Sequence, residues 1–332
     1  MLHTLIIAEA GVNHNGSLDL ALRLCDAAKE AGADIVKFQA WKTEKIITRT
    51  VAQADYQAAN TGKAESQFNM LKKLEFPYEN FRKVKEYCDD IGLTFASTAD
   101  DAESLDFLIS LGIPFIKIGS GEITNIPYLR IMGRKGLPVI MSTGMATLAD
   151  TDTALRTLRQ AGADDITLLH CTTNYPCPMR EVNLNAMLTL RDAFKLPVGY
   201  SDHTNGFEVP VAAAAMGATV IEKHFTLDRN MEGPDHLAST DPAGFKRMVE
   251  AVRNVELAMG SGEKAPQKSE AEISKVVLRR CVASRKIKAG EAFTEENICA
   301  KRNDKGCPAR YWDLIIGRKA QKNYEPDEAV EL

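Results

Sequence analysis

Short apolar runs that end in polar residues recur eight times within the first 225 residues. Each run is rich in Ile, Val, Leu or Phe, as strands buried on both faces are. Segments with helical periodicity lie between them, among them residues 18–33, 103–112 and 152–163, and several close on a glycine, which is a helix C-cap signal. The pattern predicts strands at residues 4–9, 35–40, 94–98, 115–119, 138–142, 166–171, 197–201 and 219–225.

Eight strand–helix units favour an α/β fold, a closed (β/α)₈ TIM barrel, over an open doubly wound sheet, which usually has fewer strands. In a parallel barrel the C-terminal ends of all strands meet at one mouth. The polar ends of the runs should therefore converge on one pocket, which predicts an enzyme. These ends are Glu9, Lys37–Gln39, Ser97–Thr98, Lys117–Ser120, Ser142–Thr143, His170–Thr172, Ser201–His203 and Glu222–His224.

The pattern changes near Gly262, so we expect three parts: a barrel over residues 1–262, a charged linker over 263–278 and a small β-rich domain over 279–332. The last part is too short for a large core, so we expect it to pack against its own barrel or a partner subunit. Two polar segments, residues 43–66 and 228–240, follow the second and eighth strands and should shape the mouth of the barrel.

Composition removes several classes of function. The net charge is −4, with 41 basic and 45 acidic residues, which gives no reason to expect nucleic acid or an anionic membrane as a partner. No stretch approaches the about 18 apolar residues of a membrane helix, and the first apolar run is too short for a secretory signal. Seven cysteines without zinc spacing predict reduced thiols and a cytoplasmic protein.

Two histidines suggest a metal site. Side chains alternate along a strand, so Glu222 and His224 share one face while Lys223 points the other way, and His203 shares a face with Ser201. The two imidazoles should therefore lie side by side on neighbouring strands. Such a pair suits manganese, zinc or cobalt with open positions for a substrate, and we favour this over two histidines that only hydrogen-bond within the barrel. The carboxylates expected nearby are Glu9, Glu222 and Asp235.

Two lysines lie in otherwise apolar strands. Burying Lys37 and Lys117 is costly unless anionic groups pair with them, so we expect a cradle for phosphate and carboxylate. A Schiff-base lysine of a pyruvate lyase is the second interpretation, and a lysine with a solvated head is the third. Glu9 ends the first strand and could act as a general acid or base. Hydroxyls that could complete the cradle are Thr98, Ser120, Ser142 and Ser201.

The same segments resemble the sialic acid synthases, the family that condenses phosphoenolpyruvate with an N-acyl amino hexose to a nine-carbon 2-keto sugar acid and phosphate. The matching strings are IIAEAGVNHNG, VKFQ, KIGSGEITNIPYL, STGMA, LLHCTTNYP, VGYSDHT, IEKHFTLD and GPDHLAS. The C-terminal part resembles the SAF (antifreeze-like) domain of that family, including Lys301-Arg302. The resemblance covers the whole barrel and the C-terminal part.

The resemblance implies a phosphoenolpyruvate-dependent transferase with a role for each matching residue. His203 and His224 would hold manganese, or magnesium or cobalt, and Glu9 and Lys117 would join them as catalytic residues. Arg302 would reach the barrel mouth of the other subunit in a domain-swapped homodimer. Phosphoenolpyruvate would contact Lys37, Thr98, Lys117, Ser120, Ser142 and Ser201. The amino sugar would contact Gln39, Tyr175, Glu222, Asp235 and Arg302.

The acceptor sugar stays open at this point. We expect N-acetylmannosamine, with a 2,4-diacetamido-trideoxy hexose, which gives legionaminic or pseudaminic acid, as the alternative and a phosphorylated sugar as a further one. Residues 60–76 resemble the N-acetylneuraminate and legionaminate synthases, which we favour over a pseudaminate synthase. Departures from the family pattern concern the sugar: Ala99-Asp100 replace Pro-Phe after Thr98, Asn303 replaces the usual proline, and residues 61–67 lack a clear match to a family asparagine. A glycan-binding protein whose SAF domain does the binding is the non-enzymatic alternative.

Overall fold

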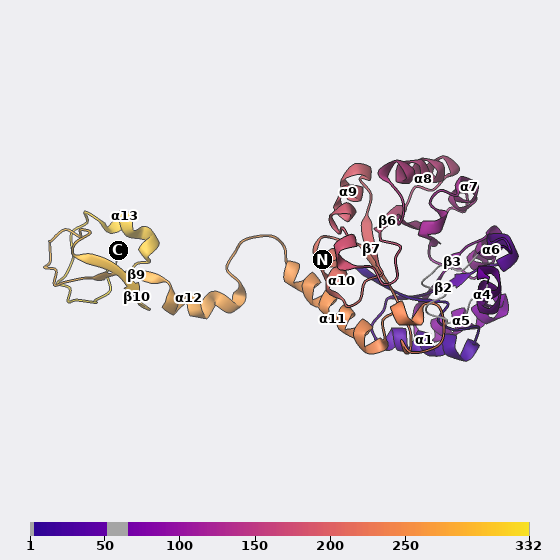
Figure 1. The fold of residues 1–332 in the computed structure, drawn as a ribbon. Helices are drawn as coiled ribbons and strands as arrows, with labels where there is room; N and C mark the ends of the chain where they lie inside the picture. Colours follow the sequence, from indigo (N-terminus) through magenta and orange to yellow (C-terminus); the bar gives the residue numbers. More distant parts are fainter. Residues whose placement is uncertain (1–2, 52–65, 332) are drawn as a thin grey trace. The chain divides into compact units, whose positions relative to one another are not determined.

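The computed structural model describes residues 3–51 and 66–331. Eight parallel strands close into a barrel in which each strand pairs with the next along the chain and β8 returns to β1 (Figure 1). The predicted (β/α)₈ class is thus confirmed. The strands are β1 (Leu5–Gly11), β2 (Ile35–Ala40), β3 (Thr94–Ala99), β4 (Ile116–Ile118), β5 (Val139–Ser142), β6 (Ile166–His170), β7 (Val198–Asp202) and β8 (Val220–His224).

Helices cover the outside of the barrel, and the main apolar core lies between them and the strands. Polar residues start several helices: Ser17 accepts a hydrogen bond from Leu20 N, and Asp101 accepts from Glu103 N and Ser104 N. The outer helices are α1 (Leu18–Glu30), α5 (Tyr78–Ile91), α6 (Ala102–Ser110), α7 (Ile126–Gly133), α8 (Leu148–Ala161), α9 (Asn185–Phe194), α10 (Glu208–Ala215) and α11 (Pro242–Met259).

The barrel interior has a separate apolar layer below the mouth. Its members are Ile7, Ile35, Ala96, Phe115, Ile140, Leu169 and Val220. On β7 this layer has Gly199, where an added Cβ would lie 2.3 Å from the Val220 carbonyl oxygen and 2.7 Å from Leu169 Cδ2. Because side chains alternate, residues two positions further along most strands point inward at the mouth, so the apolar layer forms the floor of the site.

The loops at the mouth carry short helices. They are α2 (Thr43–Ile46), α4 (Gln67–Leu74) and the 3₁₀ turns η1 (Ser120–Glu122), η2 (Met179–Glu181) and η3 (His236–Ala238). Of the expected loop at 43–66, residues 52–65 lie outside the described residues, and so do most of the positions 61–67 noted above.

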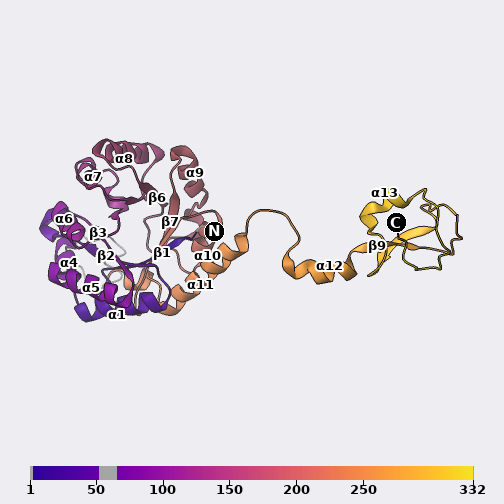
Figure 2. The ribbon, with the colours of Figure 1, turned by 180° about the vertical axis from the view of Figure 1, so that it is seen from behind.

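The chain divides into two compact units, Met1–Ser261 and Gly262–Leu332, which are each described by themselves. The second contains η4 (Lys268–Glu270), α12 (Ala271–Val277), β9 (Arg279–Ala283), β10 (Ile298–Arg302), η5 (Ala309–Tyr311) and α13 (Trp312–Ile315) (Figure 2). The segment expected as a plain linker thus includes a helix. In this second unit, β9 and β10 pair antiparallel over a separate apolar core, with Ile287, Phe293 and Tyr324 among its members.

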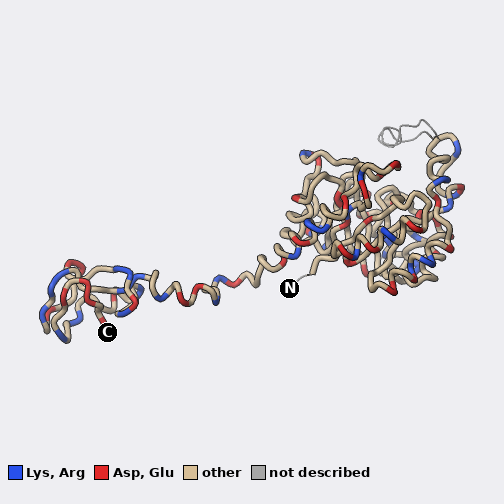
Figure 3. Tube along the Cα trace, turned by 90° about the horizontal axis from the view of Figure 1, so that it is seen from below, with Lys and Arg blue, Asp and Glu red and all other residues tan. Residues whose placement is uncertain are grey.

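Charge and hydropathy of the described residues add little to this picture. Basic and acidic residues are interspersed along both units (Figure 3). Among the helices of the described residues, none combines the length and the apolar character needed to cross a bilayer.

Candidate functional site

A cavity of about 210 Å³ opens at the C-terminal ends of the strands and gathers most of the predicted site residues. Every barrel strand, or the residues directly after it, contributes to the lining, as the closed topology requires. Predicted residues in the lining are Glu9, Lys37, Gln39, Thr98, Lys117, Ser120, Ser142, Tyr175, Ser201, His203, Glu222 and His224.

Glu9 and Lys37 form the most buried ion pair of this cavity. Their charged atoms lie 2.5 Å apart, and each side chain is 2 % exposed. Gln39 Nε2 donates to the other Glu9 oxygen at 2.7 Å. Burial, opposed mainly by Lys37, raises the pKa of Glu9 to about 7. A carboxyl group with this pKa can take up or release a proton near neutral pH.

Glu222 lies between the two lysines. Its carboxylate oxygens are 3.6 Å from Lys37 Nζ and 3.6 Å from Lys117 Nζ. Burial alone would raise the pKa of Glu222, but Lys117 and Lys37 outweigh it and hold the pKa at about 2. Burial lowers the pKa of Lys117 despite the opposing effect of Glu222. Glu222 therefore stays ionised and keeps two ammonium groups at the cavity wall.

Hydroxyl groups hold both lysines in place. Lys37 Nζ donates to Thr98 Oγ1 at 3.0 Å, and Lys117 Nζ donates to Ser142 Oγ at 2.8 Å. Ser201 Oγ donates to Glu222 Oε1 at 3.0 Å. The result is a rigid polar wall whose cations are oriented before any ligand arrives, which favours anion binding.

The loop after β5 approaches this wall closely. Ser120 Oγ accepts a hydrogen bond from Gly144 N at 3.1 Å and lies 3.2 Å from Cys171 Sγ. A Cβ at Gly144 would come within 2.2 Å of Thr173 Oγ1 and 2.7 Å of Ser120 Oγ. Only glycine leaves room for the loop here, which keeps the Ser120 hydroxyl at the cavity surface.

The two histidines face each other at the β7–β8 side of the cavity, with ring centroids 5.6 Å apart. His203 Nδ1 lies 2.7 Å from the Thr172 carbonyl oxygen, so this nitrogen is the donor and Nε2 keeps a lone pair. Burial and then the neighbouring His203 lower the pKa of His224 to about 3, and burial lowers the pKa of His203. Both rings are therefore neutral at pH 7, which is the form that binds metals.

The donor set fits a divalent ion with an open coordination sphere. His224 Nδ1 is buried, and no hydrogen bond reaches it from the described residues. Across residues 3–51 and 66–331, no three His, Cys, Asp or Glu side chains cluster closely enough to form a complete metal cage. A divalent ion held by the two imidazoles would have its remaining coordination positions open to substrate and water.

Two predicted residues, Asp235 and Arg302, are not among the residues that line the cavity. Asp235 belongs to the loop after β8, where burial raises its pKa to about 6, and Arg302 ends β10 in the second unit. Sequence reasoning assigned no role to the lining residues Asp100, Cys171 and Thr173, although Cys171 lies in the strand end His170–Thr172 that was expected at the mouth. Asp100 follows β3 directly, a position that the strand-end rule could have included, and burial and Glu122 raise its pKa to about 7.

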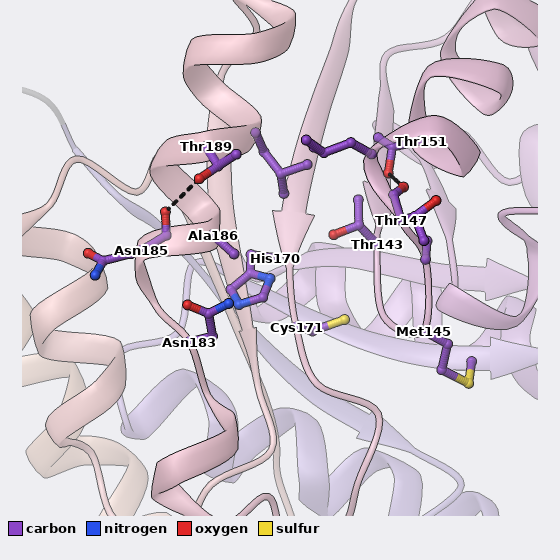
Figure 4. Close-up of a pocket in the computed structure, with 13 residues that line it drawn as sticks. Thr143, Met145, Thr147, Thr151, His170, Cys171, Asn183, Asn185, Ala186 and Thr189 are labelled. Atoms are coloured by element: carbon purple, nitrogen blue, oxygen red, sulfur yellow. Dashed lines mark hydrogen bonds between the residues drawn. The ribbon is translucent and has the colours of Figure 1, made fainter.

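A second cavity, of about 370 Å³, lies between the loops that follow β5 and β6 (Figure 4). Its lining is uncharged and includes Thr143, His170, Asn183 and Asn185. Cys171 lines both cavities, so the second one borders the polar wall described above.

Comparisons with known proteins identify the family of the chain. The NeuB family model matches residues 24–264, and the SAF domain model matches residues 281–331. N,N'-diacetyllegionaminic acid synthase of Campylobacter jejuni is 47% identical over 99% of both chains. The enzyme of the same name from Legionella pneumophila is 46% identical over 96% of this chain and 90% of the relative.

A solved structure shows the same fold. The N-acetylneuraminic acid (sialic acid) synthetase of Leptospira borgpetersenii, crystallised with citrate, is 35% identical, with a TM-score of 0.70 over 81% of this chain and 90% of that one. These matches confirm the family expected from the sequence motifs. The chain therefore belongs to the NeuB family, the family of the sialic and legionaminic acid synthases, and carries a SAF domain.

Proposed function

We propose that this protein is an N,N'-diacetyllegionaminate synthase, which condenses phosphoenolpyruvate with a 2,4-diacetamido-trideoxy hexose and releases phosphate. The observation that carries the proposal is one cavity that combines two buried lysines, bridged by Glu222, with a facing pair of neutral histidines. The lysines suit an acid with phosphate and carboxylate groups, and the histidines suit a metal-assisted carbonyl reaction.

The choice of acceptor rests on the relatives and corrects our first expectation. Two legionaminic acid synthases are 47% and 46% identical over nearly the whole chain, whereas the sialic acid synthetase is 35% identical. We therefore place the diacetamido sugar ahead of N-acetylmannosamine.

Phosphoenolpyruvate would lie against the polar wall. Lys37 and Lys117 neutralise its charges, and the hydroxyls of Thr98, Ser120 and Ser142 orient its oxygens. Because hydrogen bonds fix both ammonium groups beforehand, little reorganisation is needed as charge moves during the reaction. Ser201 supports the wall through Glu222.

The chemistry proceeds by carbon–carbon bond formation. The methylene carbon of phosphoenolpyruvate attacks the aldehyde carbon of the open-chain sugar, and water adds to the resulting cationic carbon. The tetrahedral adduct then loses phosphate by carbon–oxygen cleavage, so the bridging oxygen leaves with phosphate. Glu9, with a pKa of about 7, accepts one proton of the attacking water, and the alkoxide formed from the aldehyde oxygen takes up a proton. The remaining hydroxyl proton of the adduct leaves with the phosphate as the ketone forms. His203 and His224 would hold a divalent ion, manganese or else magnesium or cobalt, which supplies Lewis-acid polarisation of the aldehyde when bound.

The remaining predicted residues serve the sugar. Gln39 and Tyr175 line the cavity beside Glu9 and the histidines, and the Tyr175 ring contacts the His203 ring at a tilt of 40°, with centroids 4.2 Å apart. We propose that Asp235 and Arg302 complete the sugar site, with Arg302 supplied by the partner subunit of a domain-swapped homodimer.

The test is phosphate release from phosphoenolpyruvate with manganese, with 2,4-diacetamido-2,4,6-trideoxymannose and N-acetylmannosamine compared as acceptors. We expect kcat/KM to be at least tenfold higher with the diacetamido sugar and to fall after EDTA treatment. Higher efficiency with N-acetylmannosamine would reverse the choice of acceptor. No release with either sugar, together with trapping of pyruvate on Lys37 or Lys117 by borohydride, would replace the synthase with a Schiff-base lyase.

A further inference from the structure

The outward faces of β7 and β8 carry a buried ion pair that the proposed chemistry does not use. Ser201, His203, Glu222 and His224 line the cavity, so the intervening Asp202 and Lys223 point away from it. Their neighbours of the same parity, among them Tyr200 and Ile221, belong to the main apolar core. The side chains of Asp202 and Lys223 are 0 % and 2 % exposed.

Every charged atom of this pair has a partner. Lys223 Nζ contacts Asp202 Oδ2 and donates to the Thr204 carbonyl oxygen at 2.8 Å. Asp202 Oδ1 accepts from Thr204 N at 3.0 Å and from Thr204 Oγ1 at 2.8 Å. The three residues form one closed unit, which we name the Asp202–Lys223 clamp.

Fold stability alone gives no reason for the clamp. Two apolar side chains of similar volume would fill the same space without the cost of removing two charges from water. The strands already pair in register, with Asp202 opposite Lys223 and Ser201 opposite Glu222. A directional contact adds something that apolar packing does not, because it fixes distance and angle between two backbones.

The three clamp residues are direct sequence neighbours of the two histidines. His203 lies between Asp202 and Thr204 in the sequence, and these two residues are hydrogen-bonded to each other. His224 directly follows Lys223. His203 has its own support from the Thr172 carbonyl. His224 Nδ1 is buried and no described residue hydrogen-bonds to it, so the position of this ring depends on the β8 backbone and on its contacts with the rings of His203 and Tyr175.

We propose that the Asp202–Lys223 clamp positions His203 and His224 relative to each other and so sets the metal affinity of the site. The proposal rests on the proposed function only in giving the histidines a metal to bind. Asp202, Lys223 and Thr204 are positioning residues, because none of them lines the cavity.

The experiment compares two kinds of ion pair. Lys223→Met removes one half of the clamp, and the double variant Asp202→Leu/Lys223→Met replaces both halves with apolar groups, which avoids an unpaired buried charge. The matched control is Arg253→Met. Arg253 ties α11 to the other end of the barrel through Asp34 Oδ2 at 2.7 Å and the Thr4 carbonyl at 2.8 Å.

Two readouts are independent of activity. Manganese binding to the substrate-free protein is followed by the electron paramagnetic resonance of free Mn²⁺, and histidine ring signals of the metal-free protein are followed by NMR. We expect the double variant to melt near the wild-type temperature, to bind Mn²⁺ at least tenfold more weakly and to shift the His203 and His224 signals. Arg253→Met should keep Mn²⁺ affinity within twofold and leave both signals in place.

The outcomes separate the two hypotheses. A folded double variant with wild-type Mn²⁺ affinity and unchanged histidine signals would overturn the clamp's positioning role. Shifted histidine signals in a protein whose wild type binds no Mn²⁺ would support positioning while removing the metal from the proposed function. If Lys223→Met alone does not fold, the same two measurements on the double variant and on Thr204→Val test the positioning role. Thr204→Val removes one hydrogen bond of the clamp.

Discussion

The floor and the mouth of the barrel differ although the same strands build both. At the floor, Ile35, Phe115 and Ile140 pack against one another. Two residues further along the same strands, Lys37, Lys117 and Ser142 line the polar cavity. The floor is apolar and filled, and the mouth consists of paired charges that surround a cavity. A step of two residues along a strand thus leads from side chains that stabilise the fold to side chains positioned for chemistry.

The energetic logic of the two layers differs as well. Floor residues stabilise the protein because they leave water and fill space. The charges at the mouth cost free energy to bury, and hydrogen bonds and opposite charges offset that cost only in part. Substitutions should therefore affect stability at the floor and activity at the mouth, and the following predictions test this division from the largest effect to the smallest.

The largest effect is expected for Lys117→Met. It removes one of the two cations of the cavity and the hydrogen bond to Ser142. We expect kcat/KM for phosphoenolpyruvate to fall about 10³-fold, the scale seen when one preorganised charge-stabilising group is lost. Steady-state phosphate release measures it, and Lys135→Met, at a half-buried lysine outside the cavity lining, is the control. A loss below tenfold in a folded protein would contradict the role of Lys117.

Leu169→Ala tests the floor. Leu169 is fully buried in the floor layer and lies against the space that Gly199 leaves open. The cavity created should lower the free energy of unfolding by about 2–5 kcal/mol. Urea unfolding measures this, and kcat/KM at 25 °C should stay within about threefold while the protein is folded. A large loss of activity without a loss of stability would show that floor and mouth are not separable.

The smallest effect is a change in pH dependence at Glu9. Its raised pKa of about 7 means that the carboxyl group is protonated below pH 7 and becomes a base above it. We expect kcat/KM to rise about tenfold per pH unit below pH 7 and to level off above it. Glu9→Gln should lower activity and remove this limb. If the limb persists in the variant, another group titrates there, and Asp100, also with a pKa of about 7, is the next to test.

Much of the fold was predictable because it depends on local pattern. Short apolar strands that alternate with amphipathic helices along the chain build the barrel. Strand β2 begins and ends at the predicted residues. The ends of the other strands moved by at most two residues, as in β1, which continues to Gly11, and helix ends moved further, as in α8, which begins at Leu148. The helix α12 was not predicted: Ile273, Val276 and Val277 have helical spacing, but the segment that contains them was interpreted as a charged linker, and the helix buries no side chain.

The site was predictable in membership and less so in its contacts. Parity along β8 placed Glu222 and His224 on one face and Lys223 on the other, and the structure agrees. The alternation of side chains along a strand could not predict that Glu222 bridges two lysines from β2 and β4. It also could not predict that burial raises the pKa of Glu9 to about 7. Those properties depend on distances of a few ångströms and on exclusion of water.

The sequence by itself therefore determined the barrel, the ends of its strands and the chemical groups that meet at the mouth. Period-two alternation and helix signals act within a few residues, and parallel closure brings the ends together. Only the tertiary structure decided which charge meets which. Lys37 pairs with Glu9 and Glu222, and Lys223 pairs with Asp202, because the closed barrel places residues from separate strands side by side and buries them, and each pairing then fixes charge and position.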